Sequence, residues 1–388
     1  MHIVRDILDM MVEVRRHLHR FPELSNEERE TQRFLRTEII RAGLQTPRDV
    51  AGFGLSVDIQ GQGGGCERIV AIRADIDALP IAEASGEDFS SENSGAMHAC
   101  GHDAHAAMGF AAALTLHRRR ADFAGTVRII FQPAEEAEPL GGRRVVEEGL
   151  LDDVAYVLGI HVDPYIPTGT IAVREGPYTL ASDIFTIRVH GRAAHAAKPS
   201  EGVDAIVVAC SMVTEFQKVA ARETDAYEPL VVSVTEIAGG KGYNVIAEEV
   251  VLKGTIRTGH EQNRNRAALR LRSIAEGIAE IHGARAEVEI LRGEPPVVND
   301  PPVTRRLRET ALGHLEAAAI LDLPGWTAAD DFGFYSEIRP SVYFRLGIRN
   351  EERRITHPLH HPGFRVDEAA MPLGALLLAE TALALLKG

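Results

Sequence analysis

Three features are scarce in this 388-residue sequence, and each scarcity excludes a class of protein. It contains only three cysteines, Cys66, Cys100 and Cys210, with no regular spacing. We therefore expect no disulfide framework, and we expect the protein to be in a reducing compartment. Basic residues are outnumbered, with 42 Lys and Arg against 56 Asp and Glu and a formal net charge of -14. This balance argues against nucleic acid or an anionic membrane as the main partner.

Long apolar runs are the third scarcity. No run of residues reaches the roughly 18 apolar residues that a membrane-spanning helix needs. The N-terminal stretch mixes charges with apolar residues and lacks the core of a signal peptide. We therefore expect a cytoplasmic protein. The composition, 45% hydrophobic and 25% charged, is that of a globular chain, and its length favours two domains or one domain with an insertion.

The first half of the chain has the pattern of an α/β protein. An amphipathic helix is predicted at the N-terminus, and Ser25 with Glu28 forms a capping-box pattern that would open a second helix ending at Gly43. Apolar runs at 68–80, 126–136 and 154–164 then alternate with helical patterns, as in buried parallel strands.

Polar residues follow the apolar part of each of these strands. They are Asp75 and Asp77, Glu135 and Glu136, and His161. Because open α/β sheets bind ligands beyond the carboxyl ends of their strands, we expect these side chains to converge on one crevice.

The rhythm changes after about residue 181. The patterns that follow predict strand, helix, strand, strand, helix and strand up to about residue 291. This order is the ferredoxin-like arrangement, in a segment long enough to fold by itself. We therefore predict a domain at 181–291 inserted into a larger α/β domain.

The segment "MHACGHDAHAAM", residues 97–108, concentrates groups that can bind metal. His98, Cys100 and His102 alternate, so an extended backbone would point them the same way, whereas His102 and His105 share a face if a helix has begun. The spacing leaves both sets open. A thiolate beside imidazoles and carboxylates suits Zn, Co, Ni or Mn rather than Ca or Mg.

The segment "PAEE" supplies two adjacent carboxylates, Glu135 and Glu136, after a strand and a proline. Neighbouring side chains diverge, so one can hold metal while the other takes a proton from a metal-activated water, as metal hydrolases require.

A cysteine protease that pairs Cys100 with a histidine is the alternative. It leaves the carboxylates and His161 without a role.

Two further histidine segments remain ambiguous. "THPLHHPGF" offers His357, His360 and His361, and their order does not say which is a ligand. In "GRAAHAAKP", His195 lies in a loop of small residues just past a strand. A surface histidine is the simpler interpretation there, and a substrate contact is the other.

In this order, ten segments resemble the M20 metallopeptidases, and most of all the branch of amidohydrolases that act on N-acyl amino acids, hippurate and auxin conjugates. They are "RRHLHRFPELSNEE", "RADIDALP", "MHACGHDAHAAMGF", "FQPAEE", "GIHVDP", "GRAAHAAKP", "NVI", "GTIRT", "DDFGFY" and "PLHHPGFRVDE". The resemblance implies a zinc-peptidase α/β catalytic domain (1–180 and 292–388) with a mixed sheet and helices on both faces. It also implies an inserted ferredoxin-like α+β lid (181–291) that mediates dimerisation.

The resemblance also implies the roles of individual residues. It implies that two divalent ions are held by Cys100, His102, Glu136, His161 and His360. It further implies that Glu135 is the general base, that Asp77 orients the site, that His195 reaches the partner subunit's active site to stabilise the oxyanion, and that Asn244 and Arg257 hold substrate.

The sequence departs from the pattern of this family at a few positions. Much of the wider superfamily has His where Asp75 stands and a bridging Asp where Cys100 stands. Asp330 replaces a commoner Glu, and His361 stands where Ser is frequent. These departures leave the metal identity and the roles of Asp75, Asp330 and His361 open.

The function predicted from this resemblance is metal-dependent hydrolysis of N-acyl amino acids to a carboxylic acid and a free amino acid. The metal would be zinc, manganese, cobalt or nickel, and the protein would be a homodimer or higher homo-oligomer. A dipeptidase or aminopeptidase of the same fold is the first alternative, and a non-catalytic metal-binding protein is the second.

Overall fold

The computed structural model describes residues 3–387, which divide into two units. Unit 1 contains the chain up to Gly176, Val298–Gly325 and the chain from Phe334 onward, and unit 2 contains Pro177–Val297 and Trp326–Gly333. The prediction for the inserted domain, 181–291, does not include the short second segment. That segment joins unit 2 because its backbone bonds there: the N–H of Trp326 donates to the carbonyl of Tyr178 at 2.9 Å.

The sheet of unit 1 has eight strands in the order β1-β2-β4-β3-β5-β14-β6-β13. Its centre, from β4 through β3 and β5 to β14, is parallel, and β2 and β6 pair antiparallel at the two sides. The strands are β1 (Arg48–Val50), β2 (Gly54–Gln60), β3 (Ile69–Asp75), β4 (Thr126–Gln132), β5 (Val154–Pro167), β6 (Ile171–Ala172), β13 (Ile320–Leu321) and β14 (Ser341–Arg349). The sheet is therefore mixed, as predicted.

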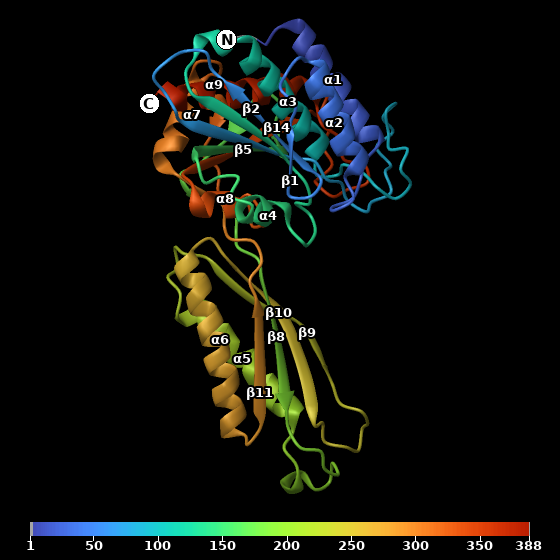
Figure 1. Ribbon diagram of the computed structural model, residues 1–388. Coiled ribbons are helices and arrows are strands. Elements are labelled where there is room, and N and C mark those ends of the chain that lie inside the picture. Colours follow the sequence, from blue (N-terminus) through green and yellow to red (C-terminus); the bar gives the residue numbers. More distant parts are fainter. Residues whose placement is uncertain (1–2, 388) are drawn as a thin grey trace. The chain divides into compact units, whose positions relative to one another are not determined.

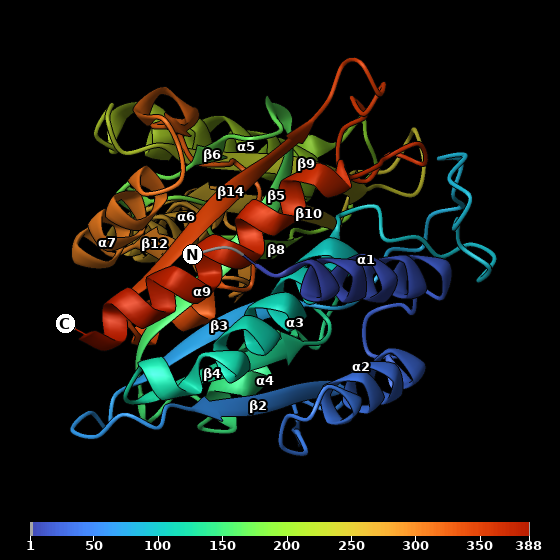
Figure 2. The ribbon, with the colours of Figure 1, turned by 90° about the horizontal axis from the view of Figure 1, so that it is seen from above.

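Helices lie on both faces of this sheet. In Figures 1 and 2, α1, α3 and α9 lie side by side on one face, and α4 lies on the other. The helices of unit 1 are α1 (Arg5–Arg20), α2 (Arg29–Arg41), α3 (His102–Arg118), α4 (Gly141–Glu147), α7 (Pro301–Leu312), α8 (Gly333–Ile338) and α9 (Met371–Lys387). Helix α3 is buried on all sides from His102 to Leu116, because its many alanines let neighbouring elements approach closely.

The C-terminal helix qualifies as a membrane span by length and composition, although the sequence was predicted to contain no apolar run of that length. The segment Glu368–Lys387 has a mean hydropathy of 1.8. However, 67% of it is buried inside the protein, where Leu377, Leu378 and Leu386 join the core of unit 1. A mostly buried apolar helix is typical of a core helix.

The capping box predicted at Ser25 and Glu28 is wrong. Helix α2 begins at Arg29, and Glu28, at the N-cap position, makes no side-chain cap bond. Instead, the Glu23 carboxylate accepts the N–H of Thr31 at 2.8 Å. Ser25 and Glu28 bond to distant segments of the chain, because both side chains point into the protein rather than along the helix.

His161 was predicted just past the end of its strand, and it lies inside β5 instead. Pairing with β3 ends at Gly159, opposite Arg73, whereas pairing with β14 continues to Pro167. Strand β5 therefore extends beyond its β3 neighbour, and His161 lies in this overhanging part.

Unit 2 has the order β8, α5, β9, β10, α6, β11 and a four-stranded antiparallel sheet ordered β11-β8-β10-β9. This is the ferredoxin-like arrangement. The elements are β8 (Asp183–His190), α5 (Ala205–Arg222), β9 (Leu230–Gly239), β10 (Glu249–Thr258), α6 (Glu261–Ile281) and β11 (Arg285–Leu291). Its apolar core lies between the sheet and the two helices. The short strands β7 (Gly176–Pro177) and β12 (Val298–Asn299) lie where the chain passes between the units.

Candidate metal centre

Metal-capable side chains cluster in unit 1 at the carboxyl ends of the parallel strands, as predicted. Three overlapping groups each have ligand atoms within 4.8 Å of one another. They are Cys100, His102 and His161; Cys100, Glu136 and His360; and His102, Glu135 and Glu136, while a fourth group, Asp75, His102 and His105, shares His102 with them. Because the groups share members, they form one cluster, which we call the metal centre. It contains all five residues predicted as ligands and the predicted base.

Gly101 gives the "CGH" segment its shape. It has φ = 88°, in the left-handed region, and a Cβ there would lie 2.5 Å from Cγ2 of Val162. Glycine is the residue that tolerates both conditions. The turn it makes places Cys100 before helix α3 and His102 at its first position, so both reach the same space.

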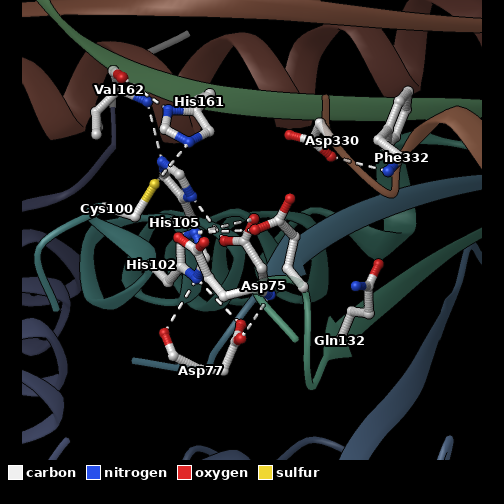
Figure 3. Close-up of polar contacts among 12 residues, drawn as sticks. Asp75, Asp77, Cys100, His102, His105, Gln132, His161, Val162, Asp330 and Phe332 are labelled. Atoms are coloured by element: carbon white, nitrogen blue, oxygen red, sulfur yellow. Dashed lines mark hydrogen bonds and ion pairs between the residues drawn. The ribbon is translucent and has the colours of Figure 1, made fainter. Parts of the chain in front are cut away.

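Hydrogen bonds orient the two buried histidines. Nδ1 of His102 lies 3.0 Å from the carbonyl oxygen and 3.1 Å from Oδ1 of Asp77 (Figure 3). Its Nε2 is buried and has no hydrogen-bond partner among the described residues. Nδ1 of His161 donates to the carbonyl of Val162 at 2.7 Å, and its Nε2 lies 3.4 Å from Sγ of Cys100. In both rings Nδ1 is held by an oxygen and Nε2 faces the cluster, as in histidine ligands of metals.

Charge at the metal centre suits a cation. Burial first, and then the carboxylates of Glu136 and Glu135, raise the pKa of the Cys100 thiol well above its usual value. Burial opposes protonation of His102, but the carboxylates of Asp75 and Asp77 outweigh it and raise its pKa to about 10. Sulfur, imidazole and carboxylate donors, with a buried Nε2 that lacks a hydrogen bond, fit a divalent transition metal.

The same environment argues against a cysteine protease. A nucleophilic cysteine needs a pKa lowered by positive neighbours. Cys100 is buried among carboxylates that raise its pKa. Burial also lowers the pKa of its neighbour His161 well below the usual value, and the nearby His105 lowers it further. Both shifts favour the neutral thiol and the neutral imidazole over a thiolate and imidazolium pair.

Asp77 joins three parts of the metal centre. Its Oδ2 accepts the hydroxyl of Ser25 at 2.7 Å and the N–H of Glu136 at 3.0 Å, while its Oδ1 faces His102. Burial disfavours the charged form, but the hydrogen bonds and charge of His102, with the Ser25 hydroxyl, lower the pKa of Asp77. Asp77 therefore stays ionised and orients its neighbours.

Asp75 and His105 form a second buried layer that the sequence analysis did not resolve. Oδ2 of Asp75 lies 2.5 Å from Nη1 of Arg73, and its Oδ1 lies 2.6 Å from Nδ1 of His105. Nε2 of His105 accepts the N–H of Val162 at 2.9 Å (Figure 3). Both nitrogens of His105 are thus engaged within the protein, which suits support of the neighbouring His161 rather than metal ligation.

One signal in the sequence could have revealed this layer. Arg73 and Asp75 are two residues apart in one strand, so their side chains point to the same face. A buried arginine beside a buried aspartate on that face forms an ion pair. His105, which also contacts Asp75, lies 30 residues further along the chain. Only the packing of α3 against the sheet reveals that contact.

Among the C-terminal histidines, His360 is the one that joins the metal centre. Its Nε2 lies 3.2 Å from Oε1 of Glu136, and its N–H donates to the carbonyl of Ala99 at 2.8 Å. His361 instead accepts the N–H of Gly363 through Nδ1 and stacks on His357, with ring centroids 4.2 Å apart.

The remaining predicted residues lie in unit 2. His195 is exposed, in the loop between β8 and α5, and its Nδ1 accepts the N–H of Ala197 at 3.1 Å. The carbonyl of the exposed Asn244 accepts the N–H of Ala196 at 3.0 Å, and Arg257 lies on β10, half-buried. Asp330 is buried, and its Oδ1 accepts the N–H of Phe332 at 2.8 Å.

Comparisons with known proteins agree with this arrangement. The model of Peptidase family M20/M25/M40 matches residues 71–384. N-acetylcysteine deacetylase of Bacillus subtilis is 38% identical over 383 residues, covering 97% of each chain. Thermostable carboxypeptidase 2 of Saccharolobus solfataricus is 36% identical, covering 96% of this chain and 94% of that one.

A solved structure shares the fold. The Bacillus subtilis YXEP protein, described as a dinuclear metal binding peptidase from the M20 family, has a TM-score of 0.86 and 34% identity, with 99% of each chain covered. With the family model matching most of the sequence and relatives that match nearly end to end, the chain belongs to Peptidase family M20/M25/M40 and is a metal-dependent amide hydrolase.

Proposed function

We propose that this enzyme hydrolyses the amide bond of N-acyl amino acids, giving a carboxylic acid and a free amino acid. The observation that carries the proposal is the sharing of Cys100 between two ligand groups, with the carboxylate of Glu135 in the same metal centre. The similarity to N-acetylcysteine deacetylase supports an acyl amino acid as the substrate.

We assign two divalent ions to the metal centre, held by Cys100, His102, Glu136, His161 and His360. The three overlapping ligand groups supply enough donors for two ions, and the related YXEP structure is described as dinuclear. The mixture of one thiolate, imidazoles and a carboxylate favours zinc, manganese, cobalt or nickel.

When bound, such ions polarise the amide carbonyl and lower the pKa of water to about 7. The protein must then supply a base. The Glu135 side chain is 12% exposed, and its Oε2 lies 3.9 Å from Nε2 of His102, so it can reach both the centre and incoming water. We assign Glu135 to take the proton from the attacking water and to return it to the nitrogen of the leaving amine. Asp77 holds His102 and the Glu136 backbone in place meanwhile.

We assign His195 as the donor that stabilises the tetrahedral oxyanion in the active site of the partner subunit. Because its Nδ1 accepts the N–H of Ala197, the Nε2 of this exposed side chain is the ring atom left to donate a hydrogen bond. Asn244 holds this loop through its backbone carbonyl, and we assign it, with Arg257, to substrate binding.

Mixing His195→Ala subunits with Glu135→Gln subunits should restore activity that neither variant has alone. Mixed dimers without recovered activity would contradict the shared site.

A homodimer through unit 2 fits this assignment. Strand β9 is an edge strand of its sheet and exposes Val231 and Ile237, and helix α5 exposes Ile206 and Val207. An edge strand with apolar side chains is suited to pairing with a second copy. Sedimentation should give a dimer, which Ile237→Lys weakens.

The substrate class is tested by a hydrolysis panel of N-acetyl, N-benzoyl and longer N-acyl amino acids beside free-amine dipeptides, each with zinc, manganese, cobalt and nickel. We expect cleavage of acylated substrates in preference to dipeptides. Faster dipeptide cleavage would favour the peptidase alternative, to which the carboxypeptidase relative lends weight. A chelator should abolish activity, and an added divalent ion should restore it.

The non-catalytic alternative is not supported, because the chain belongs to a hydrolase family.

We place the enzyme in the cytoplasm, since a free thiol used as a ligand needs a reducing compartment. Its three cysteines are unpaired in the structure.

A further inference from the structure

Ser25 and Glu28, which do not cap helix α2, contact the segment that contains the catalytic carboxylates. The side chain of Glu28 is fully buried, and its Oε1 accepts the N–H of Ala134 at 2.7 Å. The Ser25 hydroxyl donates to Oδ2 of Asp77, which also accepts the N–H of Glu136. The start of α2 is thereby linked to both ends of the segment from Ala134 to Glu136.

The backbone at Ala134 has an unusual conformation. Its φ is 49°, in the left-handed region that residues other than glycine rarely adopt. Ala134 is fully buried, and its carbonyl accepts the N–H of Gly141 at 2.8 Å. Such a conformation persists when surrounding contacts fix it. The turn lies between the end of β4 at Gln132 and the two glutamates, so it sets the direction of both side chains.

We propose that Glu28 is a positioning residue that fixes the left-handed turn at Ala134 and thereby aims Glu135 and Glu136 into the metal centre. This inference rests on the proposed roles of those two glutamates. Glu28 itself belongs to none of the ligand groups of the metal centre. Its side chain acts through the hydrogen bond that its Oε1 accepts from the N–H of Ala134.

The chemistry of Glu28 defines a matched pair of variants. Burial, and then the charge of Asp77, raise the pKa of Glu28 to about 7. Its second oxygen is buried and has no hydrogen-bond partner among the described residues. A neutral glutamine keeps both the shape and one acceptor oxygen, so Glu28→Gln should preserve the bond to Ala134. Glu28→Ala removes it.

Glu23 provides a structural control in the same segment. Its carboxylate accepts the N–H of Thr31 at the start of α2, and no bond of its side chain to the Ala134 turn is present in the described structure. Glu23→Ala should therefore weaken α2 without changing the turn.

The test uses three measurements on the purified full-length protein: kinetics and deuterium exchange with the holoenzyme, and Co²⁺ binding after the metal has been removed. In Glu28→Ala we expect kcat to fall about 100-fold with KM nearly unchanged, the size of loss that misplaced reacting groups produce. The amide of Ala134 should exchange with deuterium faster, and the metal-free protein should bind Co²⁺ more weakly in an absorption titration. Glu28→Gln should resemble the wild type in all three, and so should Glu23→Ala.

The proposal is wrong if Glu28→Ala keeps slow exchange at Ala134, if Glu28→Gln is as impaired as Glu28→Ala, or if Glu23→Ala loses kcat equally. Should Glu28→Ala fail to fold, Glu28→Asp, whose shorter side chain cannot reach Ala134, replaces it, and the same criteria apply.

Deuterium exchange at Ala134 does not depend on the activity of the enzyme. An error in the proposed reaction would instead show as an active Glu135→Gln variant.

Discussion

The two units of this protein bury different kinds of groups. In unit 1, charged and polar side chains are packed below 2% exposure around the ends of the central strands; they include Arg73, Asp75, Asp77, His102, Asp103 and His105. The core of unit 2, between its sheet and its two helices, is apolar, and the Arg264–Asp183 ion pair has both side chains buried. Because buried charge is costly unless paired or used, its concentration in unit 1 marks the functional region.

The largest effect should come from the carboxylate of Glu135. Glu135→Gln removes the base but keeps the size of the side chain, so activity should fall by about 100- to 10,000-fold. Bound metal, measured by elemental analysis, and the melting temperature should stay near those of the wild type. Turnover close to the wild-type rate would rule out Glu135 as the base.

In unit 2, the Arg264–Asp183 pair should contribute to stability rather than to the reaction. Arg264 donates to both oxygens of Asp183, which also accepts the N–H of Gly293. Arg264→Leu leaves a buried carboxylate unpaired and should lower the free energy of unfolding of this unit by about 3–5 kcal/mol.

Urea unfolding monitored by deuterium exchange in each unit measures this loss separately from unit 1. Arg272→Leu on the same helix is the control, because its pair with Glu276 is exposed and should contribute less than about 1 kcal/mol. Metal affinity should be unchanged in both variants. Equal losses of unfolding free energy in Arg264→Leu and Arg272→Leu would mean that burial does not increase the contribution of an ion pair to stability.

The layer behind the metal centre should affect both stability and metal binding. His105→Leu leaves the N–H of Val162 and an oxygen of Asp75 without their partner. We expect a loss of about 1–3 kcal/mol for each buried group left unpaired, with weaker Co²⁺ binding because His161 is next to Val162. His117→Leu, at the end of the same helix, should change neither quantity. Unaltered Co²⁺ affinity in His105→Leu would limit this layer to packing.

The smallest effect concerns pH. His19 is buried between Asp103 and Glu83, with Arg15 and His98 also near it. Burial lowers its pKa, but Asp103 and Glu83 outweigh burial and raise it to about 8 from an ordinary 6.5. Because the pKa of His19 is raised, its protonation adds about 2 kcal/mol to the free energy of unfolding. This contribution is complete below about pH 6.5 and is lost as the pH rises through about 8.

Unfolding midpoints of the wild type and His19→Gln between pH 6 and 8.5 test this prediction. The difference between the two proteins should shrink as the pH rises. The same difference at every pH would show that His19 does not titrate in this window.

The sequence predicted much of the fold because its signals are local. Strand and helix periodicities predicted the parallel core and the ferredoxin-like unit, and the positions of polar residues after strands predicted where the metal-capable side chains gather. The boundary of the insertion was not predictable, because Trp326–Gly333 joins unit 2 through backbone bonds to a segment about 150 residues earlier, at Tyr178 and Leu180.

What the sequence determined by itself is the set of residue types able to hold metal and their approximate place, because spacing along strands and turns depends on neighbouring residues. Tertiary structure decided which of them meet and what supports them. It selected His360 over His361, engaged both nitrogens of His105, and turned Glu28 from a helix cap into a contact with Ala134. These outcomes depend on hydrogen bonds between segments 30 to more than 200 residues apart, which no local pattern encodes.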